Sequence, residues 1–197
     1  MKLSVIIPVY NEEKSLEALL EAVYASPVEK EIIVVNDGSN DQTKQILERI
    51  KNRFSLHIIH KDFNEGKGAA IRSAIPHVRG DVAIIQDADL ELDPQEYGKL
   101  LEPFDLPPGG VGADVVFGSR FMSGDAHRVL YFWHSVGNRL LTLLSNMFTN
   151  LNLTDMEVCY KVFKKSVYKQ LVIEERRFGV EPELTAKVAR MGASIYE

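Results

Sequence analysis

Short apolar runs alternate with amphipathic segments through the first half of this 197-residue chain. The run Leu3–Val9 reads as a buried strand, and Glu12–Ala25 after it carries leucines at helical spacing. The same alternation recurs along the chain, and it is typical of βαβ units in which helices cover a mostly parallel sheet. The sequence therefore predicts an α/β fold with a central sheet flanked by helices.

The alternation divides the chain into expected elements. The expected strands are Leu3–Val9, Glu31–Asn36, Leu56–His60, Asp81–Gln86, Asp114–Gly118 and a short one near Tyr160–Phe163. The expected helices are Glu12–Ala25, Asp41–Phe54, Lys67–His77, Asp93–Phe104 and Glu181–Met191, and Val129–Leu151 forms a long apolar and aromatic stretch. No repeat or linker interrupts the pattern, and the length suits one domain over residues 1–197.

The two ends of the chain carry their own expectations. Pro8 breaks the first apolar run too early for a signal peptide, and no stretch approaches the ~20 apolar residues of a membrane span. Residues after Gly192 look like the opening of a further strand. We therefore expect a sequence that is truncated at its C-terminus.

Net charge and cysteine content bear on the partner and on the cellular compartment of the chain. The net charge of −5 argues against nucleic acid as a partner of the chain as a whole. The single cysteine, Cys159, cannot form an internal disulfide, which fits a reducing compartment.

Two aspartates directly follow the fourth expected strand. Asp87 and Asp89 belong to the carboxyl edge of the sheet, where open α/β folds bind ligands, and Glu91 lies two residues further on. Carboxylate oxygens there suit Mg²⁺ or Mn²⁺, hard ions that also bind the phosphates of a nucleotide. An acidic cluster that caps a helix or solvates a loop is the alternative for so short a motif.

Two further strand ends carry polar groups. Asp37 follows the second strand, where an aspartate can accept hydrogen bonds from a base or ribose, although a simple turn explains it equally. The stretch Asn64–Gly68 places glycines and Lys67 at a helix start, which suits an anion but also an ordinary loop. Each signal is weak alone, and their order along the chain gives them weight.

Four motifs in order resemble the inverting glycosyltransferases of family two, whose Rossmann-like nucleotide-sugar fold is called GT-A. The motifs are Ser4-Val5-Ile6-Ile7-Pro8-Val9-Tyr10-Asn11-Glu12, Glu31-Ile32-Ile33-Val34-Val35-Asn36-Asp37-Gly38-Ser39, Asn64-Glu65-Gly66-Lys67-Gly68-Ala69-Ala70 and Gln86-Asp87-Ala88-Asp89-Leu90. The resemblance implies a nucleotide-sugar donor held by one set of residues, namely Pro8, Tyr10, Glu12, Asp37, Lys67 and Asp87.

The second half resembles the dolichyl-phosphate mannose and glucose synthase branch of that family. The motifs are Gly118-Ser119-Arg120-Phe121, Gly137-Asn138-Arg139-Leu140-Leu141, Thr154-Asp155 with Tyr160-Lys161-Val162-Phe163, and Phe178-Gly179-Val180-Glu181-Pro182-Glu183. The branch implies a Mg²⁺ or Mn²⁺ site at Asp87, Asp89 and Glu91, with Glu91 in place of the more usual glutamine.

The same branch implies transfer of a hexose, from a donor of the UDP-glucose or GDP-mannose type, to a polyprenyl or dolichyl phosphate with inversion. Arg120 would bind the acceptor phosphate, with His134 and Asn138 close by. His134 could equally be an interfacial neighbour of Trp133. The candidate catalytic residues are Asp89, Arg120 and Asp155.

An attacking phosphate is already anionic near neutral pH and needs no general base. Asp155 therefore reads as an organiser of the acceptor site. Rival hypotheses are a family-two transferase that builds a surface polysaccharide, a nucleotidylyltransferase, and a non-catalytic domain that binds nucleotide sugars.

If the acceptor is a lipid, the apolar and aromatic stretch Val129–Leu151 is expected to contact the membrane that contains it. Arg128, Tyr131, Phe132 and Trp133 are the mixture favoured at a bilayer interface, so we expect contact with a membrane surface from the cytoplasmic side. A helix packed on the sheet or in a dimer interface is the alternative, and an oligomer stays open.

Overall fold

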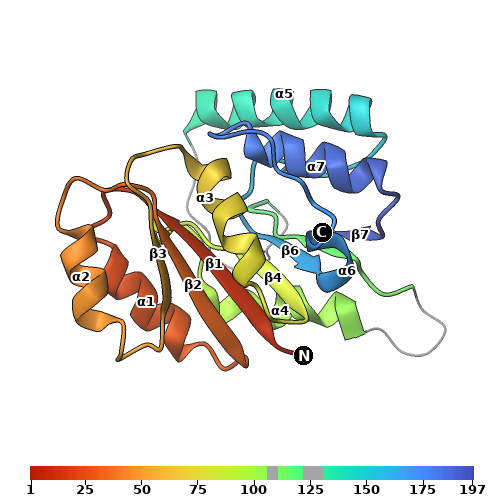
Figure 1. The fold of residues 1–197 in the computed structure, drawn as a ribbon. Coiled ribbons are helices and arrows are strands. Elements are labelled where there is room, and N and C mark those ends of the chain that lie inside the picture. The colour runs from red at the N-terminus through yellow and green to blue at the C-terminus, as the bar shows by residue number, and fades with distance from the viewer. Residues whose placement is uncertain (106–110, 122–130) are drawn as a thin grey trace.

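The computed structural model describes residues 1–105, 111–121 and 131–197, and within them one seven-stranded sheet runs through the molecule (Figure 1). The strand order is β3-β2-β1-β4-β6-β5-β7, and β6 alone runs antiparallel to its neighbours. The strands are β1 Leu3–Val9, β2 Lys30–Asn36, β3 His57–His60, β4 Val82–Ile85, β5 Val115–Phe117, β6 Lys161–Lys164 and β7 Ile195–Tyr196. The expected mostly parallel sheet is confirmed.

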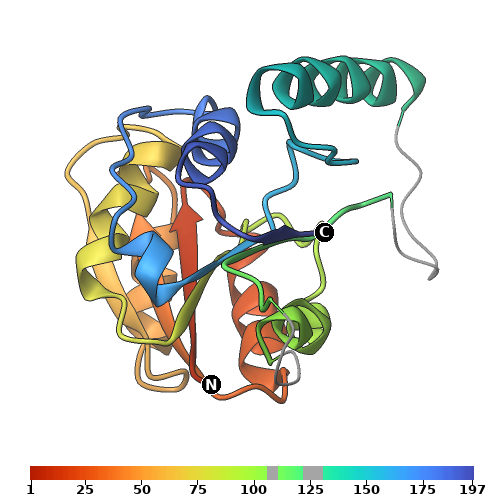
Figure 2. The ribbon, with the colours of Figure 1, turned by 90° about the vertical axis from the view of Figure 1, so that its right-hand side faces the viewer.

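Helices cover both faces of the sheet, with α3 on one face and α1 and α4 on the other (Figure 2). The α-helices are α1 Leu16–Ala25, α2 Thr43–Ile50, α3 Lys67–Ala74, α4 Tyr97–Leu101, α5 Phe132–Thr149, α6 Lys165–Tyr168 and α7 Val180–Arg190. The described residues also form three short 3₁₀ turns, η1 Ile75–His77, η2 Pro94–Glu96 and η3 Glu102–Asp105.

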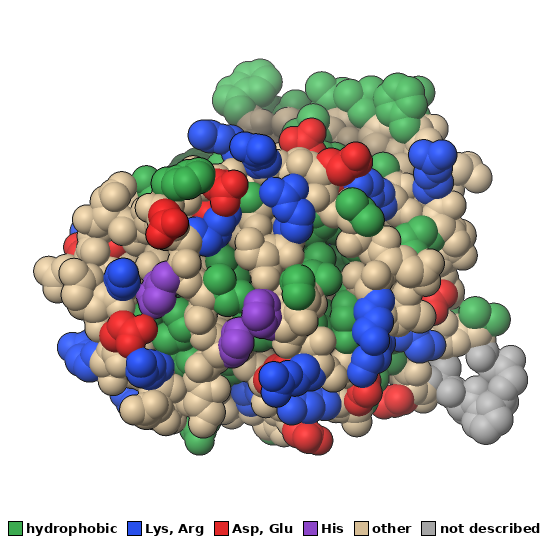
Figure 3. Space-filling view, viewed as in Figure 1, with side chains coloured by type: hydrophobic (Ala, Val, Ile, Leu, Met, Phe, Trp, Pro, Cys, Tyr) green, Lys and Arg blue, Asp and Glu red, His purple; other side chains and the backbone are tan. Residues whose placement is uncertain are grey.

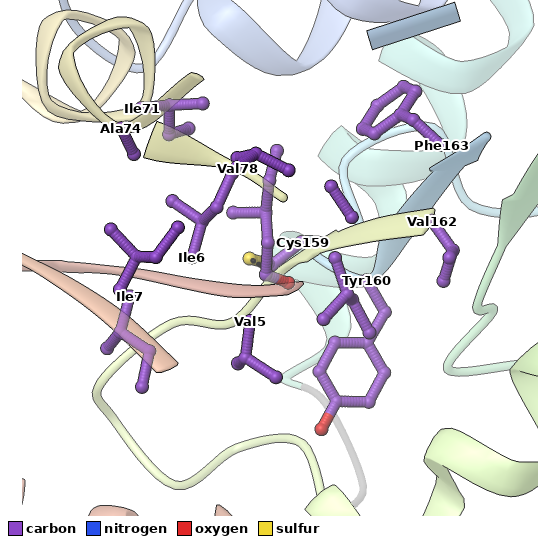
Figure 4. Close-up of a cluster of buried hydrophobic side chains, with 14 of the residues drawn as sticks. Val5, Ile6, Ile7, Ile71, Ala74, Val78, Cys159, Tyr160, Val162 and Phe163 are labelled. Carbon is purple, nitrogen blue, oxygen red and sulfur yellow. Dashed lines mark hydrogen bonds between the residues drawn. The ribbon is translucent and has the colours of Figure 1, made fainter. Parts of the chain in front are cut away.

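The central strand β1 explains why this sheet forms. It pairs with β2 on one side and β4 on the other, both parallel, and nearly every residue in it is buried. A strand covered on both faces needs an unbroken apolar run, which Leu3–Val9 supplies. In Figure 4, Ile6 points toward α3, while Val5 and Ile7 point to the opposite face.

Strand register brings the carboxyl ends of the central strands to one edge. Val9 of β1 lies opposite Asn36 of β2, and Ile6 lies opposite Ile85 of β4. The residues that follow each strand therefore gather at this edge, as the sequence predicts.

Two expected helices start later than their sequence suggests. The helix expected from Glu12 begins at Leu16, because the backbone amide of Glu12 donates to the Thr43 hydroxyl at 3.0 Å and that of Glu13 donates to Asp41 at 3.1 Å. Residues 12 and 13 are thus tied to the turn that opens α2, which begins at Thr43 rather than Asp41.

Other boundaries differ because of proline and glycine. The expected helix Asp93–Phe104 is three pieces, η2, α4 and η3, with a proline in each 3₁₀ turn and Gly98 between them. The last turn of the expected helix Lys67–His77 is the 3₁₀ turn η1, which contains Pro76. Arg128 and the expected start at Val129 lie outside the described residues.

Helix α5 has an inverted pattern of burial. Its buried side chains are the polar Asn138 and Thr142, whereas Phe132, Trp133 and all four of its leucines are exposed. The helix lies beside α7 and stands off from the sheet (Figures 1 and 2). Across the described parts of the chain, no helix is long and apolar enough to cross a membrane.

Candidate active site

A pocket of about 380 Å³ opens at the carboxyl edge of β1, β2 and β4. It contains every residue that the sequence assigns to a nucleotide-sugar donor, together with Asp89, and it adds two residues from the second half of the chain. The lining residues are Pro8, Val9, Tyr10, Glu12, Asp37, Asn64, Gly66, Lys67, Ala70, Asp87, Ala88, Asp89, Arg177 and Phe178.

Asp37 shapes the floor of this pocket. Its buried carboxylate accepts hydrogen bonds from the backbone amides of Glu65 at 3.2 Å and Gly66 at 2.7 Å. Lys61 also forms an ion pair with it at 2.9 Å. Asp37 therefore holds the loop before α3 in place, in addition to lining the pocket.

Lys67 lies between two carboxylates. Its ammonium is 2.8 and 2.9 Å from the two oxygens of Asp87 and 2.6 Å from Oε1 of Glu181, a buried residue in the first turn of α7. Burial opposes the charge on Lys67, but the neighbouring Cys159, Asp87 and Glu181 outweigh it and raise the pKa of the ammonium. Lys67 is thus a fixed positive charge at the pocket wall.

The glycines beside Lys67 serve close packing. A Cβ on Gly68 would lie 2.2 Å from the carbonyl oxygen of Glu175, and one on Gly66 would lie 2.5 Å from that of Arg176. The Arg176 carbonyl also accepts the backbone amide of Ala69 at 3.0 Å. The start of α3 therefore packs directly against the backbone of segment 174–178, and this contact brings Arg177 and Phe178 to the pocket.

The predicted metal ligands do not form one cluster. Asp87 is bound by Lys67, Asp89 accepts the backbone amide of Glu91 at 3.0 Å, and the Glu91 carboxylate lies 3.5 Å from Arg120. Within the described ranges, no three His, Cys, Asp or Glu side chains stand ready to hold a metal ion. Magnesium is commonly bound by one or two carboxylates plus substrate phosphates, so Asp89 and Asp87 at the pocket fit a metal shared with a diphosphate.

A buried amide supports the Asp87–Asp89 loop from below. The Gln86 side chain donates to the carbonyl oxygen of Asp87 at 3.0 Å and accepts the hydroxyls of Tyr97 and Tyr160, both at 2.7 Å. Sequence reasoning missed this network. The signal available was a glutamine at the end of an apolar strand, which needs buried partners.

Arg120 and Asp155 form a two-point ion pair next to this region. The guanidinium of Arg120 donates through Nε at 2.7 Å and Nη2 at 2.9 Å to the fully buried carboxylate of Asp155. Burial alone would raise the pKa of Asp155, but Arg120 and the Asn138 amide outweigh it and lower that pKa. Asp155 is therefore a permanent anion that orients Arg120.

Helix α5 and the turn 153–156 hold Asp155 in place. Asn138, Thr142 and Asn146, one helical turn apart, all bind this turn: the Asn138 amide donates to the Asp155 carboxylate at 3.0 Å, the Thr142 hydroxyl accepts a backbone amide at 3.2 Å, and Asn146 pairs with backbone groups of the turn at 2.8 and 3.1 Å. Their i, i+4, i+8 spacing was the available signal, of which sequence reasoning used only Asn138.

The last residue of the sequence also contacts the turn. The Glu197 carboxylate accepts the backbone amides of Thr154 at 2.8 and 2.9 Å and of Asp155 at 3.0 Å. Sequence reasoning gave Glu197 no role, because nothing local relates it to residues 42 positions away.

Of the three predicted phosphate ligands, His134 and Asn138 lie one turn apart on α5, and Arg120 lies beside Asp155. His134 is exposed on α5, one turn before the buried Asn138, and Arg120 bonds to Asp155 and Glu91. The exposed neighbour Trp133 makes the interfacial alternative consistent with this position.

Comparison with known proteins gives three kinds of match. The model of the family described as Glycosyl transferase family 2 matches residues 4–172. Dolichyl-phosphate beta-glucosyltransferase ALG5A of Trichomonas vaginalis is 30% identical over 208 residues, which cover 99% of this chain and 64% of that protein. Undecaprenyl-phosphate 4-deoxy-4-formamido-L-arabinose transferase of Edwardsiella ictaluri is 31% identical over 193 residues, covering 95% and 56%. The chain thus spans less than two thirds of either relative.

Among solved structures, the crystal structure of glucosyl-3-phosphoglycerate synthase from Mycobacterium tuberculosis with Mn²⁺, uridine diphosphate and phosphoglyceric acid is similar, with a TM-score of 0.73. It is 20% identical, and the match covers 99% of this chain and 67% of that one. This likeness concerns the fold, and it confirms the expected GT-A architecture.

Proposed function

The chain belongs to glycosyl transferase family 2, and we propose that it moves a hexose from a nucleotide-diphosphate sugar to the phosphate of a polyprenyl lipid, with inversion at the anomeric carbon. One observation carries the proposal: Arg120, oriented by Asp155, stands next to the carboxylate loop of a pocket suited to a nucleotide. The names of the two relatives, both transferases to a lipid phosphate, support the acceptor class.

The donor occupies the pocket at the edge of the sheet. Pro8, Tyr10, Glu12 and Asp37 bind its base and ribose, at the ends of β1 and β2. Lys67 and Asp87 line the same pocket next to these residues and are assigned to the part of the donor nearer the diphosphate. UDP-glucose is our first choice of donor and GDP-mannose the second.

The diphosphate of the nucleotide sugar is negatively charged, and Mg²⁺ or Mn²⁺ suits the phosphate and carboxylate oxygens that would surround it. When bound, a divalent ion stabilises the negative charge on the leaving nucleotide. Asp89 would hold the ion together with the phosphates, and Asp87 would assist from the same loop. Glu91 lies 3.5 Å from Arg120 and does not line the pocket.

The acceptor phosphate binds to the free edge of Arg120. Nε and Nη2 donate to Asp155, and Nη1 donates to Glu91 at 3.5 Å, which leaves one further N–H on each of Nη1 and Nη2 for a phosphate oxygen. That oxygen attacks the anomeric carbon and forms the new bond, while the bond from this carbon to the donor diphosphate breaks and the nucleotide leaves. Asp155 takes no proton, because it is buried, paired and held at a low pKa.

Helix α5 faces the membrane that contains the acceptor. Its exposed side chains form an apolar ridge along the top of the molecule (Figure 3). The same helix positions Asp155 through Asn138, so contact with lipid and orientation of Arg120 meet in one element. The free, buried Cys159 is compatible with the cytoplasmic face.

A transfer assay tests this proposal. The chain is incubated with labelled UDP-glucose or GDP-mannose, Mn²⁺ or Mg²⁺, and a polyprenyl phosphate in detergent. We expect lipid-extractable label that needs the metal and is lost in Asp89→Ala and Arg120→Ala. Arg190→Ala, at the far end of α7 from Glu181, is the control for loss of an arginine. Donor binding without any lipid product would instead favour a saccharide acceptor.

A further inference from the structure

Glu181 is a buried carboxylate that the proposed mechanism does not use. It lies in the first turn of α7, is 6% exposed, and does not line the donor pocket. Its Oε1 lies 2.6 Å from the Lys67 ammonium, and its Oε2 is buried without a hydrogen-bond partner among the described residues. A carboxylate in this position costs free energy unless its charge is compensated, so Lys67 is its main stabilising partner.

The ion pair joins two motifs that are far apart in the sequence. Lys67 belongs to the loop and helix after β3, whereas Glu181 opens α7. Lys67 reaches Asp87 on the pocket side and Glu181 on the interior side. The ammonium is thus held from two sides, and only the Asp87 side faces the donor.

This two-sided hold affects how Asp87 meets a ligand. A buried ammonium with one carboxylate would bind that carboxylate with its full charge. Because Lys67 also pairs with Glu181, its attraction for Asp87 is weaker than it would be with Asp87 as its single partner. Glu181 also keeps Lys67 in position if Asp87 turns toward a bound nucleotide or metal. We infer that Glu181 is a positioning residue for donor binding that acts through Lys67. This inference rests on the proposed function and assigns a role in it to α7.

The surrounding structure favours this role. The segment before α7 brings Arg177 and Phe178 to the pocket, and it is anchored at Gly66 and Gly68 on either side of Lys67. The Glu181 contact therefore adds a charged connection to a place where backbone packing already joins α3 to this segment.

The test is a double-mutant cycle read by donor binding. Isothermal titration with UDP-glucose and GDP-mannose, each with Mn²⁺, gives the Kd for the wild type, Glu181→Gln, Lys67→Met and the double variant. We expect Glu181→Gln to weaken binding about tenfold, since Lys67 then pairs with Asp87 alone and the donor must displace it. Because Glu181 acts through Lys67, the double variant should bind no more weakly than Lys67→Met.

A matched control comes from the same helix. Glu183, two residues on, accepts the backbone amides of Glu174 at 2.7 Å and Glu175 at 3.0 Å and pairs with Lys187. Glu183→Gln is expected to lower the Tm, and any effect on the donor Kd should add to that of Lys67→Met. Steady-state transfer provides a second readout, in which Glu181→Gln raises KM for the donor and leaves KM for the lipid unchanged.

The outcomes separate this inference from the function on which it rests. If the wild-type chain binds the donor and the Kd of Glu181→Gln lies within twofold of the wild-type Kd, Glu181 has no positioning role. Fully additive effects of Glu181→Gln and Lys67→Met would exclude that role as well. Either result leaves the proposed function standing. A wild-type chain that binds neither nucleotide sugar overturns the proposed function and this inference with it.

Discussion

At the scale of residues, the site depends on charges that hold one another in place. Asp155 is completely buried, and its two oxygens accept hydrogen bonds from Arg120 and from the Asn138 amide. A bidentate pair of this kind fixes the plane of the guanidinium, which a lysine could not do. The orientation of Arg120 is therefore set before any ligand arrives.

Breaking this pair should destabilise the fold. Asp155→Asn leaves Arg120 largely buried without its anion, and we expect a loss of about 3 kcal/mol in the free energy of unfolding. Urea denaturation measures it. Asp114→Asn is the control, because its ion pair with Lys164 is 3.9 Å long and both side chains are at least a third exposed; it should cost little. Equal losses in the two variants would contradict the account.

The contribution of Asp155 should also depend on pH. Its folded-state pKa is lowered, with Arg120 as the main stabilising partner, so its contribution is complete above the unfolded pKa of about 3.9. It is lost as pH falls below that value through the folded pKa. The difference in unfolding free energy between wild type and Asp155→Asn should thus be constant from pH 7 to about 5 and shrink below about 4. A difference that grew on acidification would refute this assignment.

At the scale of elements, the pocket depends on how closely segment 174–178 packs against α3. Gly68 permits that contact, since a Cβ there would meet the Glu175 carbonyl oxygen at 2.2 Å. The added Cβ and the Glu175 carbonyl oxygen are both attached directly to the backbone, so neither can move aside as the end of a flexible side chain could. The residues that this contact brings to the pocket are Arg177 and Phe178.

Gly68→Ala should therefore displace the segment. We expect a lower Tm and an increase of several-fold in the donor Kd, measured by thermal denaturation and titration. Gly98→Ala is the matched control, because Gly98 lies in α4 and a Cβ there meets nothing within 4 Å. Alanine favours a helix over glycine, so this control should keep or raise the Tm. If Gly68→Ala bound the donor as tightly as the wild type, the packing of segment 174–178 against α3 would not be needed for donor binding.

Helix α5 should bind lipid through its exposed rings. Phe132 and Trp133 are 70% and 79% exposed, so changing both to serine should weaken sedimentation with phospholipid vesicles several-fold and leave the Tm nearly unchanged. Tyr24→Ser is the control, since Tyr24 is 57% exposed on α1, a helix on the sheet. Vesicle binding that survives the α5 change would show that these two rings do not bind the lipid.

At the scale of the whole molecule, the hydrophobic periodicity of the sequence predicts which strands form and which edge of the sheet carries the site. The apolar runs predict the parallel strands and their carboxyl edge, because burial on both faces demands such runs. Asp37, Lys67, Asp87 and Asp89 follow from that edge and meet in one pocket. These inferences use only neighbours in the sequence.

Contacts between distant segments were not predictable in the same way. Glu181 meets Lys67 across 114 positions, and Glu197 meets Asp155 across 42, so neither pairing has a local signal. Helix starts at Leu16 and Thr43 were missed for the same reason, since cross-loop hydrogen bonds hold the preceding residues. Tertiary contacts, not propensity, decide these positions.

The most direct test of the central claim compares acceptors that differ only in their phosphate. Initial rates of sugar transfer are measured with a polyprenyl phosphate, the same polyprenol without phosphate, and a short oligosaccharide, at one donor and metal concentration. We expect transfer to the phosphorylated lipid alone, lost in Arg120→Ala. Equal transfer to the free polyprenol, or transfer to the oligosaccharide only, would contradict a phosphate acceptor bound by Arg120.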